Sequence, residues 1–270
     1  MIRTDSVSNQ LVFNTVKLDA VFADGRTSTG TGFIVSVGTA ELMIPFIVTC
    51  AHCVAGATKV VLNCVTAKAD STPDLGNVQT WVLDTSLLTL AAKHPTLDLM
   101  LIPFGPVLNQ ASSAGRPIYH RQLAIENFVT EAQREQLTAL ESIVFAGYPL
   151  GLHDTKTALP ILRVGWTASP VWADFNGEPR FLIDAEVFPG SSGSPVFILN
   201  EGAYSTPGGL AVGVRFHLIG MITSSLSSTS SGVAAGQHVG LGSALHARVI
   251  SAFLQQTAAR LAPMAAAPAS

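Results

Sequence analysis

The chain has 270 residues and a formal net charge of −3, and hydrophobic residues make up 48% of it. Charged residues make up only 12%, about half of the roughly 25% that is usual in soluble domains, which excludes a disordered tail protein. The sequence holds no cluster of lysine and arginine that would bind phosphates, so we expect no nucleic-acid partner.

The N-terminal region contains no apolar stretch long enough for a signal peptide. The most apolar window, LMIPFIVTCAHCVAGA from Leu42, is interrupted by Pro45 and His52. It is also shorter than the roughly 20 residues that span a bilayer. We therefore expect a soluble, cytoplasmic protein that binds no membrane.

Short apolar stretches separated by turn residues fill residues 1–120, which is typical of an all-β barrel or sandwich. In chain order they read LVFNTVKLDAVFA, GTGFIVSVG, MIPFIVTCAHCV, KVVLNCVTA, TWVLDTS and LDLMLIPFG. We interpret this region as a first β domain.

Residues 121–141 have a different pattern, RQLAIENFVTEAQREQLTAL followed by Glu141, and we predict a helical connector between two β domains. Thr130 and Gln133 have the spacing of a helix-capping pair.

A second series of strands follows in residues 142–262: SIVFAGYPL, ILRVGWTASPVW, RFLIDAEVF, SPVFILN, FHLIGMITSS and HVGLGSAL. This second β domain is expected to end in a helix, HARVISAFLQQTAARL, in which Val249, Phe253 and Leu254 have helical spacing. Residues 263–270 form a Pro/Ala tail with little to bury, which we expect to be disordered.

The three cysteines are Cys50, Cys53 and Cys64. An odd number of closely spaced cysteines argues against a disulfide framework. Cys50 and Cys53 form a C-x-x-C motif, but no second Cys/His pair has zinc-finger spacing and no βαβ pattern surrounds the motif. We expect buried thiols rather than a metal or redox site.

The stretch FPGSSGSPVF, Phe188 to Phe197, is either a Ser/Gly turn between two strands or the site of a serine nucleophile. A serine hydroxyl needs a base within hydrogen-bond reach, and the base needs an orienting carboxylate. His52 lies where an apolar strand turns. Asp98 lies in the apolar segment HPTLDLMLIPF, where a carboxylate is costly unless it is paired.

The order His52, Asp98, Ser192 is that of the chymotrypsin arrangement. An α/β-hydrolase would need an acid and then a histidine after the serine. After Ser192 there is no aspartate and one glutamate, Glu201. Ser194 also occupies the last glycine position of the G-x-S-x-G motif, so that interpretation is excluded.

The sequence resembles bacterial trypsin-like serine proteases of the chymotrypsin fold, akin to the protease domain of the high-temperature-requirement proteases. GTGFIVS, VTCAHCV, LDLMLIPF, FAGYPLG, FLIDAEVFPGSSGSPVF and LIGMITSS occur in the family's order, from about Gly30 to Ile250. The resemblance implies two six-stranded antiparallel β-barrels with a short connecting helix and a C-terminal helix. It implies no cofactor and no metal.

The resemblance also implies roles for individual residues. Ser192 matches the nucleophile, and the backbone N–H groups of Gly190 and Ser192 match the oxyanion hole. Thr223 matches a hydroxyl that helps to hold the catalytic aspartate. The backbone from Thr223 through Ser224 to Ser225 matches the strand to which an extended substrate adds.

Several positions depart from the family pattern. Ser191 replaces the aspartate that pairs with a new N-terminus in mammalian zymogens, so we expect no activation of that kind. Cys53 matches a disulfide cysteine whose partner is missing, which fits a reducing compartment.

Substrate preference is left open by the sequence. Glu186 matches the floor of the S1 pocket and predicts basic P1 residues, unless a shift of one residue points it away. A small or medium apolar P1 residue is the alternative. Ile222 replaces the histidine of glutamate-specific members, so an acidic P1 residue is not expected.

These features predict a serine endopeptidase that forms an acyl-enzyme with a polypeptide substrate, which could be one dedicated protein. The alternative is a protease-like peptide-binding or regulatory module whose oxyanion hole forms only with a partner. The segment SSLSSTSSGVAAGQ, Ser224 to Gln237, is either a mobile loop beside S1 in that role or a plain solvent loop. The sequence does not indicate an oligomeric state.

Overall fold

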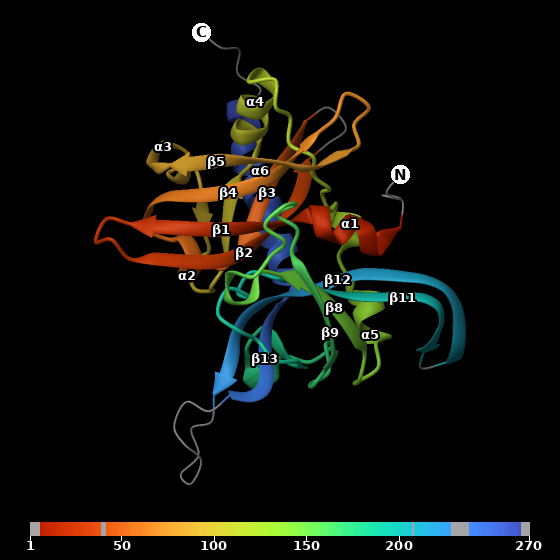
Figure 1. Ribbon diagram of the computed structural model, residues 1–270. Helices are drawn as coiled ribbons and strands as arrows, with labels where there is room; N and C mark the ends of the chain where they lie inside the picture. Colours follow the sequence, from red (N-terminus) through yellow and green to blue (C-terminus); the bar gives the residue numbers. More distant parts are fainter. Residues whose placement is uncertain (1–5, 39–41, 207, 228–237, 266–270) are drawn as a thin grey trace.

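The computed structural model describes residues 6–38, 42–206, 208–227 and 238–265. In Figure 1 the first part of the chain, red to yellow, forms an upper β-sheet, and the later part, green to blue, forms a lower barrel. All the strand pairs in both are antiparallel. The predicted all-β class is confirmed.

The first sheet has seven strands in the order β5-β4-β1-β2-β3-β7-β6. Their bounds are β1 Thr15–Phe22, β2 Thr27–Gly38, β3 Met43–Thr49, β4 Ala57–Ala67, β5 Pro73–Asp84, β6 Ala92–Lys93 and β7 Met100–Pro103. Six of these were predicted. The additional strand, β6, has two residues paired with β7, too few to show an alternating pattern.

The chain enters this sheet through a helix that the sequence analysis missed. Helix α1, Val7–Asn14, contains the start of the stretch predicted as strand from Leu11. The Ser6 side chain caps it by accepting a hydrogen bond from the Asn9 N–H. The Asn14 side chain then donates to the backbone oxygens of Ile34 and Arg121. These tertiary bonds fix the transition from helix to strand at Thr15.

The second sheet is a closed six-stranded barrel in the order β10-β13-β12-β11-β8-β9, with the predicted number of strands. Their bounds are β8 Ser142–Gly147, β9 Ile161–Thr167, β10 Arg180–Asp184, β11 Pro195–Thr206, β12 Gly209–Ser227 and β13 His238–His246. Beyond the barrel, β11 and β12 continue as a long hairpin that projects to the right in Figure 1.

Short helices lie between the strands. Their bounds are α2 Ala51–Val54, α3 Thr85–Leu88, α4 Gly105–Ser113, α5 Glu131–Glu135, and the 3₁₀ helices η1 Ile125–Asn127, η2 Pro149–Gly151 and η3 Phe175–Gly177. Apart from α2, which carries His52, they serve as connections.

The connector is mostly extended, which corrects the prediction of a helix over residues 121–141. Only η1 and α5 are helical. Leu123 bridges to Val35 of β2, and Phe128 bridges to Leu218 of β12. An extended chain buries these two apolar side chains against different β domains, so tertiary contacts override helix propensity. The predicted cap is confirmed, because Thr130 and Gln133 form a capping box at the start of α5.

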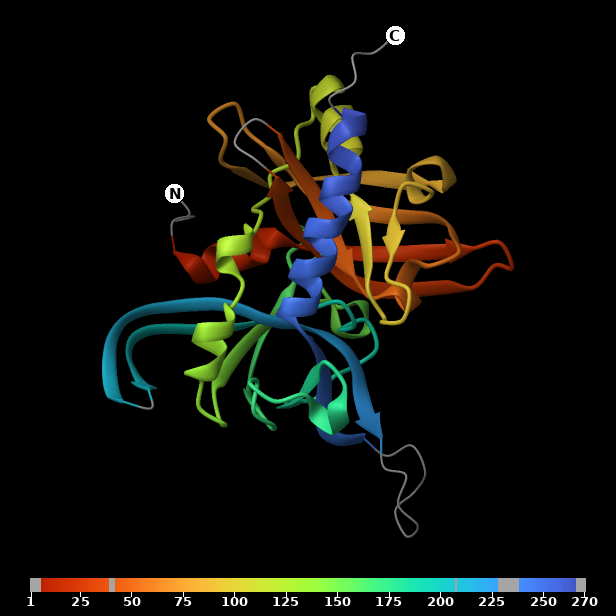
Figure 2. The ribbon, with the colours of Figure 1, turned by 180° about the vertical axis from the view of Figure 1, so that it is seen from behind.

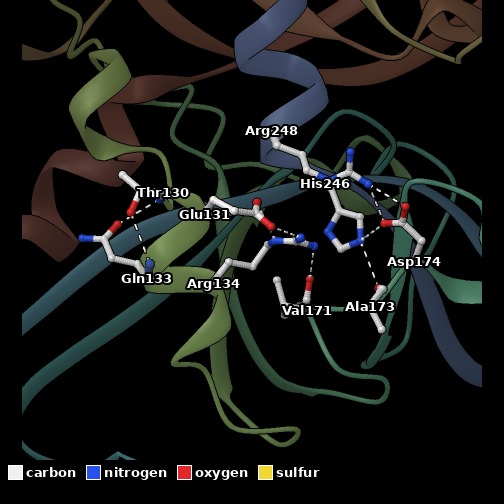
Figure 3. Close-up of polar contacts among 9 residues, drawn as sticks. All are labelled: Thr130, Glu131, Gln133, Arg134, Val171, Ala173, Asp174, His246 and Arg248. Carbon is white, nitrogen blue, oxygen red and sulfur yellow. Dashed lines mark hydrogen bonds and ion pairs between the residues drawn. The ribbon is translucent and has the colours of Figure 1, made fainter.

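Polar contacts fasten the connector and the last helix to the barrel (Figure 3). Arg134 of α5 pairs with Glu131 and donates to the backbone oxygen of Val171. Arg248, at the start of the last helix, donates to Asp174 at 2.6 Å, and the His246 ring lies 3.3 Å from the same carboxylate. Burial lowers the pKa of His246 to about 4, so this histidine is a neutral structural group.

Helix α6, Ala247–Ala265, runs from the barrel up along the first sheet, as Figure 2 shows. It contacts β2, β12 and β13 and buries Ile250 and Leu254 completely. Residues 263–265, predicted as tail, belong to this helix, and residues 266–270 lie outside the described residues. Within the described ranges, no helix combines the length and apolar character needed to cross a bilayer.

Candidate active site

His52 and Asp98 meet where the first sheet faces the barrel. β3 ends at Thr49, which pairs with Met100 of β7, so the helix after one strand lies beside the turn before the other. Asp98 Oδ2 lies 2.6 Å from His52 Nδ1, and Oδ1 accepts the His52 backbone N–H at 2.9 Å. The partner that the apolar surroundings of Asp98 require is therefore His52.

The two groups stabilise each other's charged forms. The hydrogen bond that His52 donates to Asp98, with a smaller contribution from Cys53, raises the pKa of His52 to about 10. Partial burial raises the pKa of Asp98, but the hydrogen bonds from His52 outweigh it, so this pKa lies below its ordinary value. The carboxylate thus holds the ring orientation and favours imidazolium.

Ser192 lies on a tight turn between β10 and β11. Gly190 and Gly193 flank it with φ of +90° and +89°, a conformation that favours glycine. The Ser191 N–H donates to Phe188 O, and the Gly193 N–H donates to Ile222 O. Within the described residues the N–H groups of Gly190 and Ser192 have no hydrogen-bond acceptor. Two free donors on one turn are what an oxyanion hole needs.

The structure distinguishes the two adjacent serines. Ser191 is 1% exposed and its hydroxyl lies inside the protein. Ser192 lines an open cleft. Only Ser192 is placed to meet a substrate.

Thr31 of β2 holds this turn against the first sheet, a role that the sequence analysis missed. Its N–H donates to Ser192 O at 2.9 Å, and its hydroxyl donates to Gly190 O at 2.7 Å. The same hydroxyl accepts the Tyr148 N–H at 3.1 Å. The sequence did carry a signal for this role. Thr31 is a polar residue inside the apolar strand GTGFIVSVG, and a buried hydroxyl requires hydrogen-bond partners.

His52, Asp98 and Ser192 line one cavity of about 450 Å³. The other lining residues are Arg180, Val187, Phe188, Pro189, Thr223, Ser224 and Ser225. The Ser192 hydroxyl donates to the backbone oxygen of Thr223 at 3.2 Å. In the described part of the chain it makes no hydrogen bond to His52, so the two side chains line the same cleft without being joined.

Thr223 does not hold Asp98 through its side chain, which corrects the implied role. Its hydroxyl donates to Ser243 O of β13 at 3.2 Å. The pairing of β12 with β13 shifts register between Ile222 and Ser224, and a β-bulge of this kind redirects a side chain.

Glu186 does not line the cleft. It is exposed, and its backbone oxygen accepts a hydrogen bond from Arg163. The next residue, Val187, is buried and lines the cleft instead. Successive side chains of an extended segment point in opposite directions. The structure therefore has the shift of one residue that points Glu186 away from the cleft.

All three cysteines are buried free thiols. Cys53 Sγ lies 3.6 Å from His52 Nε2, and a Cβ on Gly30 would lie 2.6 Å from the same sulfur. The missing disulfide partner would therefore stand at Gly30. One atom each of Cys50, His52 and Asp98 lie within 4.8 Å of one another. Because His52 and Asp98 already pair and the Cys50 thiol donates to Ile222 O, we assign no metal to them.

Comparison with known proteins agrees with this geometry. Residues 30–203 match the family model of the trypsin-like peptidase domain. The chain belongs to the trypsin-like peptidase family. The matched segment of this peptidase runs from β2 into β11 and includes His52, Asp98 and Ser192. A comparison with curated proteins finds no match.

Solved structures confirm the chymotrypsin-like fold of this peptidase. The protease Anisep from Arthrobacter nicotinovorans is 15% identical, with a TM-score of 0.50 over 93% of this chain and 97% of that one. A structure described as GrC is 12% identical, with a TM-score of 0.51 over 91% and 94% of the two chains. Family and fold together support a protease-type hydrolase acting on polypeptides.

Proposed function

We propose that this protein is a serine endopeptidase that cleaves polypeptides through an acyl-enzyme. The observation that carries the proposal is the His52–Asp98 pair facing the same cleft as Ser192. Ser192 Oγ attacks the substrate carbonyl while His52 Nε2 takes its proton, and His52 then returns the proton to the leaving amine. Water attacks the ester by the same route and releases the acid.

The turn supplies the remaining stabilisation. As the carbonyl becomes tetrahedral, its oxygen gains negative charge, which the N–H groups of Gly190 and Ser192 stabilise by donating hydrogen bonds to it. One such donor contributes about 3 kcal/mol to transition-state stabilisation. The bonds from Thr31 fix the two flanking peptide units before substrate arrives, so no reorganisation is needed there.

Substrate binding can also free the nucleophile. β11 pairs with β12 only as far as Met221, so the edge of β12 from Thr223 onward is open to an added peptide strand. A substrate N–H that donates a hydrogen bond to Thr223 O displaces the Ser192 hydroxyl from that oxygen. The hydroxyl then turns to His52.

A second candidate function rests on that same hydroxyl. With Ser192 bonded to Thr223 rather than to His52, the chain could be a protease-like peptide-binding or regulatory module that is completed only by a partner. The loop proposed for this role lies mostly in residues 228–237, outside the described residues. Peptide cleavage only in the presence of a partner extract would favour this candidate.

We propose a small or medium apolar P1 residue, because Val187 lines the cleft and exposed Glu186 does not. The cytoplasmic location, the bacterial origin and the dedicated protein substrate stay predictions from the sequence.

The test is intact-mass analysis after exposure to a fluorophosphonate probe. We expect one adduct on the wild type and on Ser191→Ala, and none on Ser192→Ala or His52→Ala, because only an activated Ser192 reacts. An adduct on Ser192→Ala would contradict the assignment. A wild type that reacts only with a partner present would support the second candidate.

The Cys53 thiol should influence the pH dependence of cleavage. The neighbouring Cys50 and His52 side chains lower the pKa of Cys53 to about 6, and the Cys53 sulfur, 3.6 Å from His52 Nε2, in turn raises the pKa of His52. His52 must be neutral to accept a proton, so activity rises with pH through this pKa. In Cys53→Ala we expect the acid limb of the kcat/KM profile to move about one unit lower.

The matched control for this experiment is Cys64→Ala, another buried thiol that does not line the cleft. Its pH profile should coincide with that of the wild type. An acid limb that stays in place or moves higher in Cys53→Ala would rule out the contribution of Cys53 to the pKa of His52.

A further inference from the structure

Arg180 lines the same cleft as Ser192 and has no part in the chemistry described above. It is the first residue of β10, which is separated from β12 by one strand, β13. His52, Asp98 and Arg180 are the titratable residues that line the cleft. Because the first two are paired with each other, Arg180 is the cation left to meet a substrate.

Strand register shows which part of a substrate Arg180 would meet. Leu182 pairs with Ser243, and Ser243 pairs with Ser224, so these three side chains share one face of the sheet. Arg180 is two residues from Leu182 and lies on the same face. Ser224 is exposed and small, so it leaves the path from Arg180 to the cleft open.

An added peptide strand would align in a fixed way along the open edge of β12. The Ser192 hydroxyl lies 3.2 Å from Thr223 O, which places the residue under attack, P1, opposite Thr223. An antiparallel strand then places P2, the preceding residue, opposite Ser224. The P2 side chain therefore shares the face of Ser224 and Arg180.

The guanidinium of Arg180 has N–H donors available to a substrate. Its Nη2 pairs with Glu178 at 2.5 Å, and among the described residues the guanidinium has no other side-chain hydrogen-bond partner. Glu178 is 59% exposed, and an ion pair so open to solvent is weak enough for a substrate carboxylate to displace it. A guanidinium presents five N–H donors in a fork that fits a carboxylate.

We propose that Arg180 forms a subsite that selects an acidic side chain at P2. The inference rests on the proposed endopeptidase function and adds a substrate class to it: polypeptides with glutamate or aspartate immediately before a small apolar P1 residue. Lysine or arginine at P2 is disfavoured by like charge.

The test compares the peptides acetyl-Ala-Ala-Xaa-Val-aminomethylcoumarin with Xaa as Glu, Gln or Lys. In the wild type we expect kcat/KM for the Glu peptide to exceed that for the Gln peptide about tenfold, with the Lys peptide lowest. In Arg180→Gln the Glu and Gln peptides should become equal, while the Gln peptide changes less than about twofold. Arg26→Gln, which removes an exposed arginine that pairs with Asp24 and does not line the cleft, should keep the tenfold preference.

A second measurement does not depend on catalysis. The same peptides are titrated onto Ser192→Ala and onto Ser192→Ala combined with Arg180→Gln, and their Kd values are compared. We expect the Glu peptide to bind the first about tenfold more tightly than the Gln peptide and to lose this advantage in the second. A Glu/Gln ratio near one in the first, or one that survives Arg180→Gln, would overturn the subsite. Absent fluorophosphonate labelling together with an Arg180-dependent ratio would overturn the endopeptidase and leave the subsite standing.

Discussion

Asp98→Asn is expected to lower kcat about 10⁴-fold, the loss typical of this substitution in a Ser-His-Asp triad, while the protein stays folded. Asp98 accepts two hydrogen bonds from His52, one from Nδ1–H and one from the backbone N–H. An asparagine that turns its NH₂ toward the ring forces Nδ1 to be the acceptor. The proton then sits on Nε2, which can no longer take the proton of Ser192.

The measurement is kcat on a coumarin peptide together with thermal unfolding of the same samples. Loss of the carboxylate should also return the pKa of His52 toward its ordinary value, because the hydrogen bond to Asp98 is the main cause of the increase. Asp24→Asn is the matched control, since Asp24 forms an exposed pair with Arg26 in the β1–β2 turn. A kcat for Asp98→Asn near that of the control would show that Asp98 does not orient the base.

The pairing of Asp98 was open to prediction because a strong local constraint points to it, whereas the choice of Ser192 among the neighbouring serines came from the family resemblance. A carboxylate amid LDLMLIPF must have a partner, and the chain order of His52, Asp98 and Ser192 limits the choice of fold. Glycines on both sides of a serine likewise indicate backbone that other residues cannot adopt. The carboxylate and the glycines act within a few residues, so these two signals are visible without knowledge of the fold.

The predictions that were wrong and the site residues that were missed depend on the register between strands that the sequence alone does not align. Whether Glu186 or Val187 faces the cleft is a matter of one residue, and the bulge at Thr223 exists only in the pairing of β12 with β13. Thr31 reaches the site from a strand far from Ser192 in the sequence, and Arg180 reaches it through the pairing of β10 with β13 and of β13 with β12. The prediction of a helical connector was wrong for the same reason, because Leu123 and Phe128 are buried by two different domains.

Gly193→Ala is expected to damage both the stability and the reactivity of the protein. Gly193 has φ of +89°, and a Cβ there would lie 1.9 Å from Thr31 O and 2.8 Å from Thr49 Oγ1. Backbone strain at such a position costs about 1–3 kcal/mol, and the turn must also move away from Thr31. Together we expect a loss of about 3–5 kcal/mol of unfolding free energy, or a Tm lower by about 10 °C in a chain of this size.

Gly25→Ala separates the two contributions to that loss. Gly25 has nearly the same φ, +83°, but a Cβ there would meet nothing within 4 Å, so this variant carries the backbone strain without the collision. We expect it to lose about 1 kcal/mol and to keep the wild-type rate of fluorophosphonate labelling. Gly193→Ala, examined below its own Tm, should label far more slowly, because a turn displaced from Thr31 no longer holds the N–H groups of Gly190 and Ser192 in place. Equal Tm values and equal labelling rates in the two variants would show that the contact with Thr31 does not preorganise the turn.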